Sequence, residues 1–108
     1  MVRYEMSSES VGVVTRVGAG SDCTLRNARA LTDSLVGLVN AGSGVEVDCS
    51  DVAQVDITFV QTIVSAERSF AARDLSFAML AAPECVHSAF ARAGIAMPGT
   101  GRFEPSRN

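Results

Sequence analysis

The sequence predicts an α/β fold, a single domain in which helices pack on a mixed sheet of four to five strands. Two kinds of segment alternate along the chain. One kind has the two-residue alternation of apolar and polar residues that is typical of strands, and the other has a helical period. The length of 108 residues suits one hydrophobic core. The content of 47% hydrophobic and 19% charged residues is that of a globular protein.

Residues 2–17 are predicted to form a hairpin of two strands. Apolar and charged residues alternate over 2–6, and a polar stretch separates this segment from a β-branched run over 11–17. A glycine-rich loop, 18–22, follows the hairpin. The loop leads into the first segment of helical period.

The first helix is expected over roughly residues 24–40. Its leucine and alanine residues recur at three- and four-residue steps, which gives the segment one apolar face. Asp22 or Thr24 can cap its beginning, and Asn40 with Gly42 can end it.

Residues 57–73 carry two opposing signals. The first residues of the segment are β-branched or aromatic and favour a strand by propensity. The segment is too long for a strand, however, and its apolar residues fall on one helical stripe. Asp56 is the expected N-cap of this helix. The residues expected to pack against the sheet are Phe59, Ile63, Ala66 and Phe70.

The other elements are simpler to assign. Valine alternates with acidic residues over 45–49, which predicts a strand, and a loop follows at 50–55. An apolar strand is expected over 75–81, and a helix that begins near Pro83 should end at Gly94. The domain is expected to span residues 1–96, with a mobile tail over 97–108.

Charge and cysteine content argue against several functional classes. Nine basic and twelve acidic side chains give a net charge of −3 without a run of one sign, so we expect no nucleic-acid partner. Three widely spaced cysteines and one histidine do not form a zinc site of the usual spacing. The first residues lack the apolar stretch of a signal peptide, and no run approaches the ~20 apolar residues of a membrane span. We therefore expect a cytoplasmic protein without membrane insertion, metal or cofactor.

The order of the elements predicts where a partner binds. Right-handed crossovers make the strands that they join parallel, so the first two helices should begin at the same edge of the sheet. The loop 18–22 and the segment 51–58 lie at this edge. Open α/β sheets bind ligands and partners there.

Four segments in this order carry a family resemblance. They are the strand over 45–50, the segment 55–59, the strand over 75–80, and the helix over 86–95 that ends in glycine and an aliphatic residue. Their order and spacing resemble a STAS domain of the anti-sigma factor antagonist family over roughly residues 2–95. The chain departs from the family in lacking its last helix.

The resemblance implies a regulatory site at the second helix. In that family the helix begins with Asp-Ser-Ser-Gly, and the residue at the third position is phosphorylated by a kinase that is also an anti-sigma factor. Thr58 has that position here, while Ile57 replaces the first serine and Phe59, which should crowd an approaching kinase, replaces the glycine. Thr58 is therefore the phosphorylation candidate. The residues expected to contact the partner are Asp22, Asp56, Ile57, Thr58 and Phe59.

The implied partner is an anti-sigma factor and serine/threonine kinase of the histidine-kinase-like ATPase class, in a bacterial partner-switching or chemotaxis pathway. A homodimer is a further assembly left open. The site residues also have a plainer interpretation, in which Asp56 and Asp22 are helix caps and Thr58 is part of an ordinary first turn. A helix N-cap stabilises by about 1 kcal/mol without any partner.

Two alternatives to this function remain. One is a STAS subunit of a lipid-transport ATP-binding cassette complex, which would use the same edge without phosphorylation. The other is a small thiol enzyme built on Cys85 and His87, although residues two apart on a helix point in different directions. Nucleotide binding at Gly18 and Gly20 is disfavoured because Cys23 stands where a third glycine would be needed. We therefore expect no catalytic residues.

Overall fold

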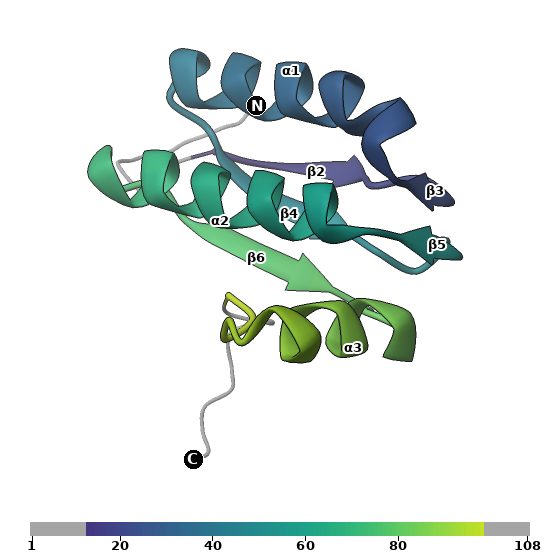
Figure 1. Cartoon of the computed structure of the whole chain (residues 1–108). Coiled ribbons are helices and arrows are strands. Elements are labelled where there is room, and N and C mark those ends of the chain that lie inside the picture. Colours follow the sequence, from purple (N-terminus) through teal and green to yellow (C-terminus); the bar gives the residue numbers. More distant parts are fainter. Residues whose placement is uncertain (1–12, 99–108) are drawn as a thin grey trace.

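The computed structural model describes residues 13–98, in which strands and helices follow one another along the chain (Figure 1). The elements are β2 (Val14–Gly18), β3 (Asp22–Cys23), α1 (Leu25–Ala41), β4 (Gly44–Asp48), β5 (Gln54–Val55), α2 (Ile57–Ala72), β6 (Phe77–Leu80) and α3 (Glu84–Ala93). The predicted α/β class is confirmed. The three predicted helices are confirmed as well, each within about two residues of its expected bounds.

The larger sheet has the strand order β2-β4-β6, and all of its described pairings are parallel. Val47 of β4 is the partner of Val17 on one side and of Met79 on the other. The antiparallel strand predicted over 2–6, which would make the sheet mixed, lies outside the described residues. Two short strands, β3 and β5, form a second parallel pair that was predicted as loop.

The three helices begin at the edge toward which the strands point, on the right of Figure 1. α2 lies between α1 and α3 and contacts both. The core between the helices and the sheet includes Val45 and Val47 of β4, Leu35 of α1 and Phe90 of α3. The strands alternate as expected, since Glu46 of β4 points away from the core and forms an ion pair with Arg16 at 3.2 Å.

The interpretation of 57–73 as a helix is confirmed, because burial overrides the strand propensity of its first residues. Phe59, Ile63 and Phe70 are buried on one face of α2, and the Phe70 ring meets that of Phe77 edge to face at a centroid distance of 5.5 Å. Ala66 is partly buried against the same core.

The packed part of the chain extends beyond the predicted boundary at residue 96. Met97 packs against the core and Pro98 is buried. These two residues therefore lie against the folded domain. Residues 99–108, which make up the rest of the predicted tail, lie outside the described residues.

Candidate functional site

A connected surface forms where α1 and α2 begin. We call it the helix-start edge and define it by Asp22, Leu25, Asp56, Ile57 and Thr58. The β3–β5 pair aligns Asp22 with Gln54, and the Ser21 carbonyl accepts hydrogen bonds from the N–H groups of Ala53 and Gln54 at 2.9 and 3.0 Å. This short ladder brings the two loops expected at the sheet edge together.

Asp56 bonds to the first turns of both helices. Its Oδ1 accepts a hydrogen bond from the Thr58 N–H at 2.9 Å, which confirms the predicted N-cap of α2. Its Oδ2 accepts from the Leu25 N–H of α1 at 3.0 Å. The first N–H groups of a helix lack partners within the helix, so one carboxylate satisfies two such groups from two helices.

Asp22 stabilises the turn before α1 but does not cap the helix itself. Its Oδ1 accepts hydrogen bonds from the N–H and the hydroxyl of Thr24, at 3.1 and 2.6 Å. Thr24 is the N-cap residue by position, and its own side chain makes no capping bond. Neither of the two capping residues considered from the sequence, Asp22 and Thr24, has a side chain that accepts a hydrogen bond from an N–H group of α1. Asp56, from a distant segment, accepts the hydrogen bond from the Leu25 N–H instead.

Two large apolar side chains of the helix-start edge are exposed at the surface. Leu25 is 71% exposed and Ile57 is 52% exposed. Thr58 is half-buried, and among the described residues its hydroxyl makes no hydrogen bond. The edge therefore combines apolar contact area with an accessible hydroxyl at the second position of a helix.

Phe59 does not belong to this surface, which corrects the expectation that it contacts a partner. It is only 2% exposed and belongs to the hydrophobic core. Its ring lies on the buried face of α2, together with the side chains of Val60 and Ile63. Since the ring points into the core, it does not crowd the approach to Thr58 either.

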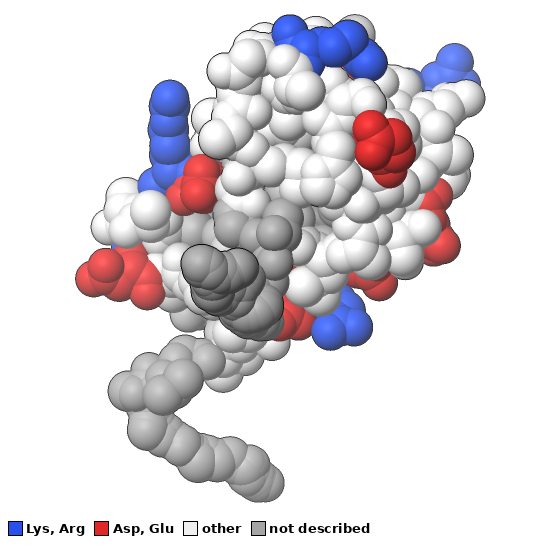
Figure 2. All heavy atoms as spheres, turned by 90° about the horizontal axis from the view of Figure 1, so that it is seen from below, with Lys and Arg blue, Asp and Glu red and all other residues white. Residues whose placement is uncertain are grey.

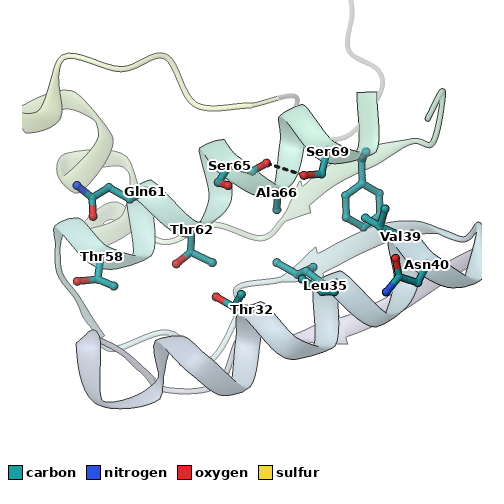
Figure 3. Close-up of a pocket in the computed structure, with 12 residues that line it drawn as sticks. Thr32, Leu35, Val39, Asn40, Thr58, Gln61, Thr62, Ser65, Ala66 and Ser69 are labelled. Carbon is teal, nitrogen blue, oxygen red and sulfur yellow. Dashed lines mark hydrogen bonds between the residues drawn. The ribbon is translucent and has the colours of Figure 1, made fainter. Parts of the chain in front are cut away.

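A groove of about 440 Å³ lies between α1 and α2 and begins at Thr58 (Figure 3). In Figure 3, Thr58 and Thr62 of α2 project toward α1, and Thr32 and Leu35 of α1 project toward α2. Sequence reasoning did not predict the groove. Its only signal was the run of small and hydroxylated residues at helical spacing along α2.

The cysteines lie near each other but not in an activated arrangement. Burial, with smaller effects of neighbouring acidic groups, raises the pKa of Cys23 to about 11 and that of Cys49 to about 12. Cys85 is partly exposed, and its Sγ donates to the Val52 carbonyl at 3.8 Å, while His87 is exposed. A nucleophilic thiol requires a lowered pKa, so the buried pair has the opposite character.

Within residues 13–98, no group of three or more His, Cys, Asp or Glu side chains is placed to hold a metal ion. None of the helices in that part of the chain has the length and apolar content required to span a bilayer.

At the end of β4, hydrogen bonds from Ser50 lower the pKa of Asp48. The loop that resembles a nucleotide site is joined to the sheet, since the Ala19 N–H donates to the Asp48 carbonyl at 2.9 Å.

Comparison with known proteins gives one result that covers most of the chain. The family model described as "Mlab, STAS domain" matches residues 6–97. A search of curated proteins finds no match. The matched range contains every described strand and helix, including both elements that build the helix-start edge. The chain therefore belongs to the STAS domain family.

Proposed function

We propose that this STAS domain is a regulatory protein-binding module that binds its partner through the helix-start edge. The observation that carries the proposal is the exposure of Leu25, whose N–H donates to Asp56, and of Ile57, which follows Asp56 in the chain. Exposed apolar side chains grouped beside polar ones are typical of protein contact surfaces. The Asp56 hydrogen bonds fix the two helix ends relative to each other, so the surface is preorganised for a partner.

We infer that phosphorylation of Thr58 controls this binding. The hydroxyl lies in the first turn of α2, where the helix end favours negative charge. A phosphate adds about −1.5 to −2 charges on a residue whose N–H bonds to the Asp56 carboxylate and which follows the exposed Ile57. We expect the modified helix to remain folded while the partner, which has to cover this charge, dissociates.

The partner class that we propose rests on the resemblance to anti-sigma factor antagonists and is compatible with the surface chemistry. We propose that the partner is an anti-sigma factor kinase of the histidine-kinase-like ATPase class and that the two proteins bind each other in the bacterial cytoplasm. On the face that Figure 2 shows, basic side chains are scattered, some of them beside acidic ones, and they do not form the continuous basic patch that nucleic acids require. We infer no catalytic role, because the Cys85 thiol donates to the Val52 carbonyl and, in the described part of the chain, makes no hydrogen bond with His87. The raised pKa values of Cys23 and Cys49 oppose activation of those two thiols.

The test compares three forms of the protein, the wild type, Thr58→Glu and Thr58→Val. Affinity for a candidate kinase, chosen from the neighbouring genes, is measured by calorimetry, and urea unfolding is measured in parallel. We expect Thr58→Glu to lose affinity by about tenfold or more while its free energy of unfolding changes by less than about 1 kcal/mol. Thr58→Val should bind normally and resist labelling by the kinase with ATP.

A matched control is Ser34→Glu, which introduces the same charge on the exposed side of α1. Equal affinity of wild type and Thr58→Glu would remove Thr58 from the interface. Normal binding by every variant together with no phosphorylation would contradict the switch but leave the binding module. Recovery of an ATP-binding cassette protein in place of a kinase would favour the transport-subunit alternative.

A further inference from the structure

The groove between α1 and α2 has an apolar floor that the helices themselves do not fill. Val36 is 51% exposed and Val39 and Ala66 are half-buried, so these three side chains give the groove its accessible apolar surface, while Leu35 and Phe70, which also line it, are nearly inaccessible to solvent. Protein interiors contain few voids larger than a water molecule. A groove of about 440 Å³ over such a floor is instead within the 300–1,000 Å³ that is usual for small-molecule sites.

The walls of the groove are polar but uncharged. Hydroxyl groups come from Thr32 on α1 and from Thr58, Thr62, Ser65 and Ser69 on α2, and none of the described residues that line the groove is Asp, Glu, Lys, Arg or His. The Ser69 hydroxyl donates to the Ser65 carbonyl at 3.3 Å, as the dashed line in Figure 3 shows, so it offers a ligand its acceptor lone pairs. The other four hydroxyls can donate or accept.

We propose that this groove binds an uncharged, elongated amphiphile, with an apolar chain on the floor and hydroxyl groups at the walls. An ionised ligand group is disfavoured because burying a charge without a partner is costly and the lining has no opposite charge. The apolar chain replaces water over the apolar side chains that remain accessible in the groove, Val36 and Val39. The groove adjoins the helix-start edge and shares Thr58 with it, but binding of the amphiphile does not depend on protein binding at that edge.

The experiment uses the full chain labelled with ¹⁵N and titrated with octyl glucoside below its micelle concentration. Two further probes are octanoate, which has a chain of the same length and a negative charge, and free glucose, which has no chain. We expect saturable shifts of the amide signals of Thr32, Val36, Thr62 and Ser65 with octyl glucoside. Octanoate and glucose should bind at least about tenfold more weakly.

Two variants in the groove and one control variant test the location. Ser65→Phe fills the groove from an exposed position and should weaken octyl glucoside binding by about tenfold or more, whereas Ser34→Phe, on an exposed part of α1 outside the groove, should not. Val36→Asp is a second groove variant that adds a charge at an exposed site, and it should have the same effect. Thermal melting checks that all three are folded.

Several results would overturn the proposal. These are the absence of saturable shifts, shifts confined to residues outside the groove, unchanged affinity in both groove variants, or equal binding of octanoate. None of them bears on partner binding, which is measured separately with the Thr58 variants.

Discussion

Asp56 accepts a hydrogen bond from the Leu25 N–H at 3.0 Å, so the residue that caps α2 also holds the first turn of α1. The two residues are 31 positions apart in the chain. The geometry of the helix-start edge therefore depends on one carboxylate. If that edge binds a partner, Asp56 supports binding even without touching the partner.

Replacing Asp56 by alanine should destabilise the fold by about 1–2 kcal/mol, because an N-cap and a second bond to a helix start are lost. Urea unfolding measures the change. Asp51→Ala removes a carboxylate from an exposed loop position and is the matched control, with an expected effect under about 0.5 kcal/mol. Equal stabilities for the two variants would show that the Asp56 bonds contribute nothing net.

Phe70→Ala should lower the free energy of unfolding by about 3–5 kcal/mol, since the ring is fully buried and packs on Phe77. Ile57→Ala, on the same helix but 52% exposed, should change it by only about 0.5 kcal/mol. Denaturant unfolding of both variants checks the difference. A small effect of Phe70→Ala would contradict the packing of α2 on the sheet described here.

Two glycine-to-alanine substitutions should have opposite effects. Gly37 lies within α1 with no atom within 4 Å of an added Cβ, so Gly37→Ala should stabilise by about 0.5–1 kcal/mol through helix propensity. At Gly44 an added Cβ would collide with Ser76, so Gly44→Ala should destabilise by about 1–3 kcal/mol. Thermal melting of the pair gives the signs directly, and equal signs would contradict the close approach of Gly44 to Ser76.

Alkaline pH should destabilise the protein through its buried thiols. Cys23 and Cys49 keep their protons in the folded state, with pKa values of about 11 and about 12, whereas an unfolded thiol titrates near 9.0. The unfolded chain therefore loses protons first, and stability falls as the pH rises above 9.0. The chain contains no lysine and one tyrosine, so few other groups titrate there.

The measurement is urea unfolding at several pH values above and below 9.0. The double variant Cys23→Ala, Cys49→Ala should show a flatter alkaline dependence than the wild type, even if it is less stable at neutral pH. An unchanged slope in the double variant would mean that other groups cause the alkaline loss.

The element types could be predicted from the sequence because they depend on local period and local caps. The spacing of Phe59, Ile63 and Phe70 outweighed the strand propensity of the residues around them, and Asp56 marked the start of α2. Gly42 and Gly94 marked the ends of α1 and α3, since both adopt the left-handed conformation that favours glycine. The short strands β3 and β5 were missed because two residues show no period.

The candidate site could be predicted only in part. The positions of Asp56, Ile57 and Thr58 at a helix start follow from the sequence, but the same motif also suggested Phe59, which the fold buries. A motif gives the order of residues along the chain. Which of them face solvent depends on how α2 rotates against the sheet, and that is a property of the whole core.

The sequence by itself therefore determined the α/β class, the bounds of the helices and the residue that caps α2, since each rests on neighbours within a few positions. Only the tertiary structure decided that Asp56 reaches Leu25 and that a groove opens between α1 and α2. Both features join segments that are far apart in the chain. Their geometry arises when the two helices pack side by side on the sheet, which no local pattern encodes.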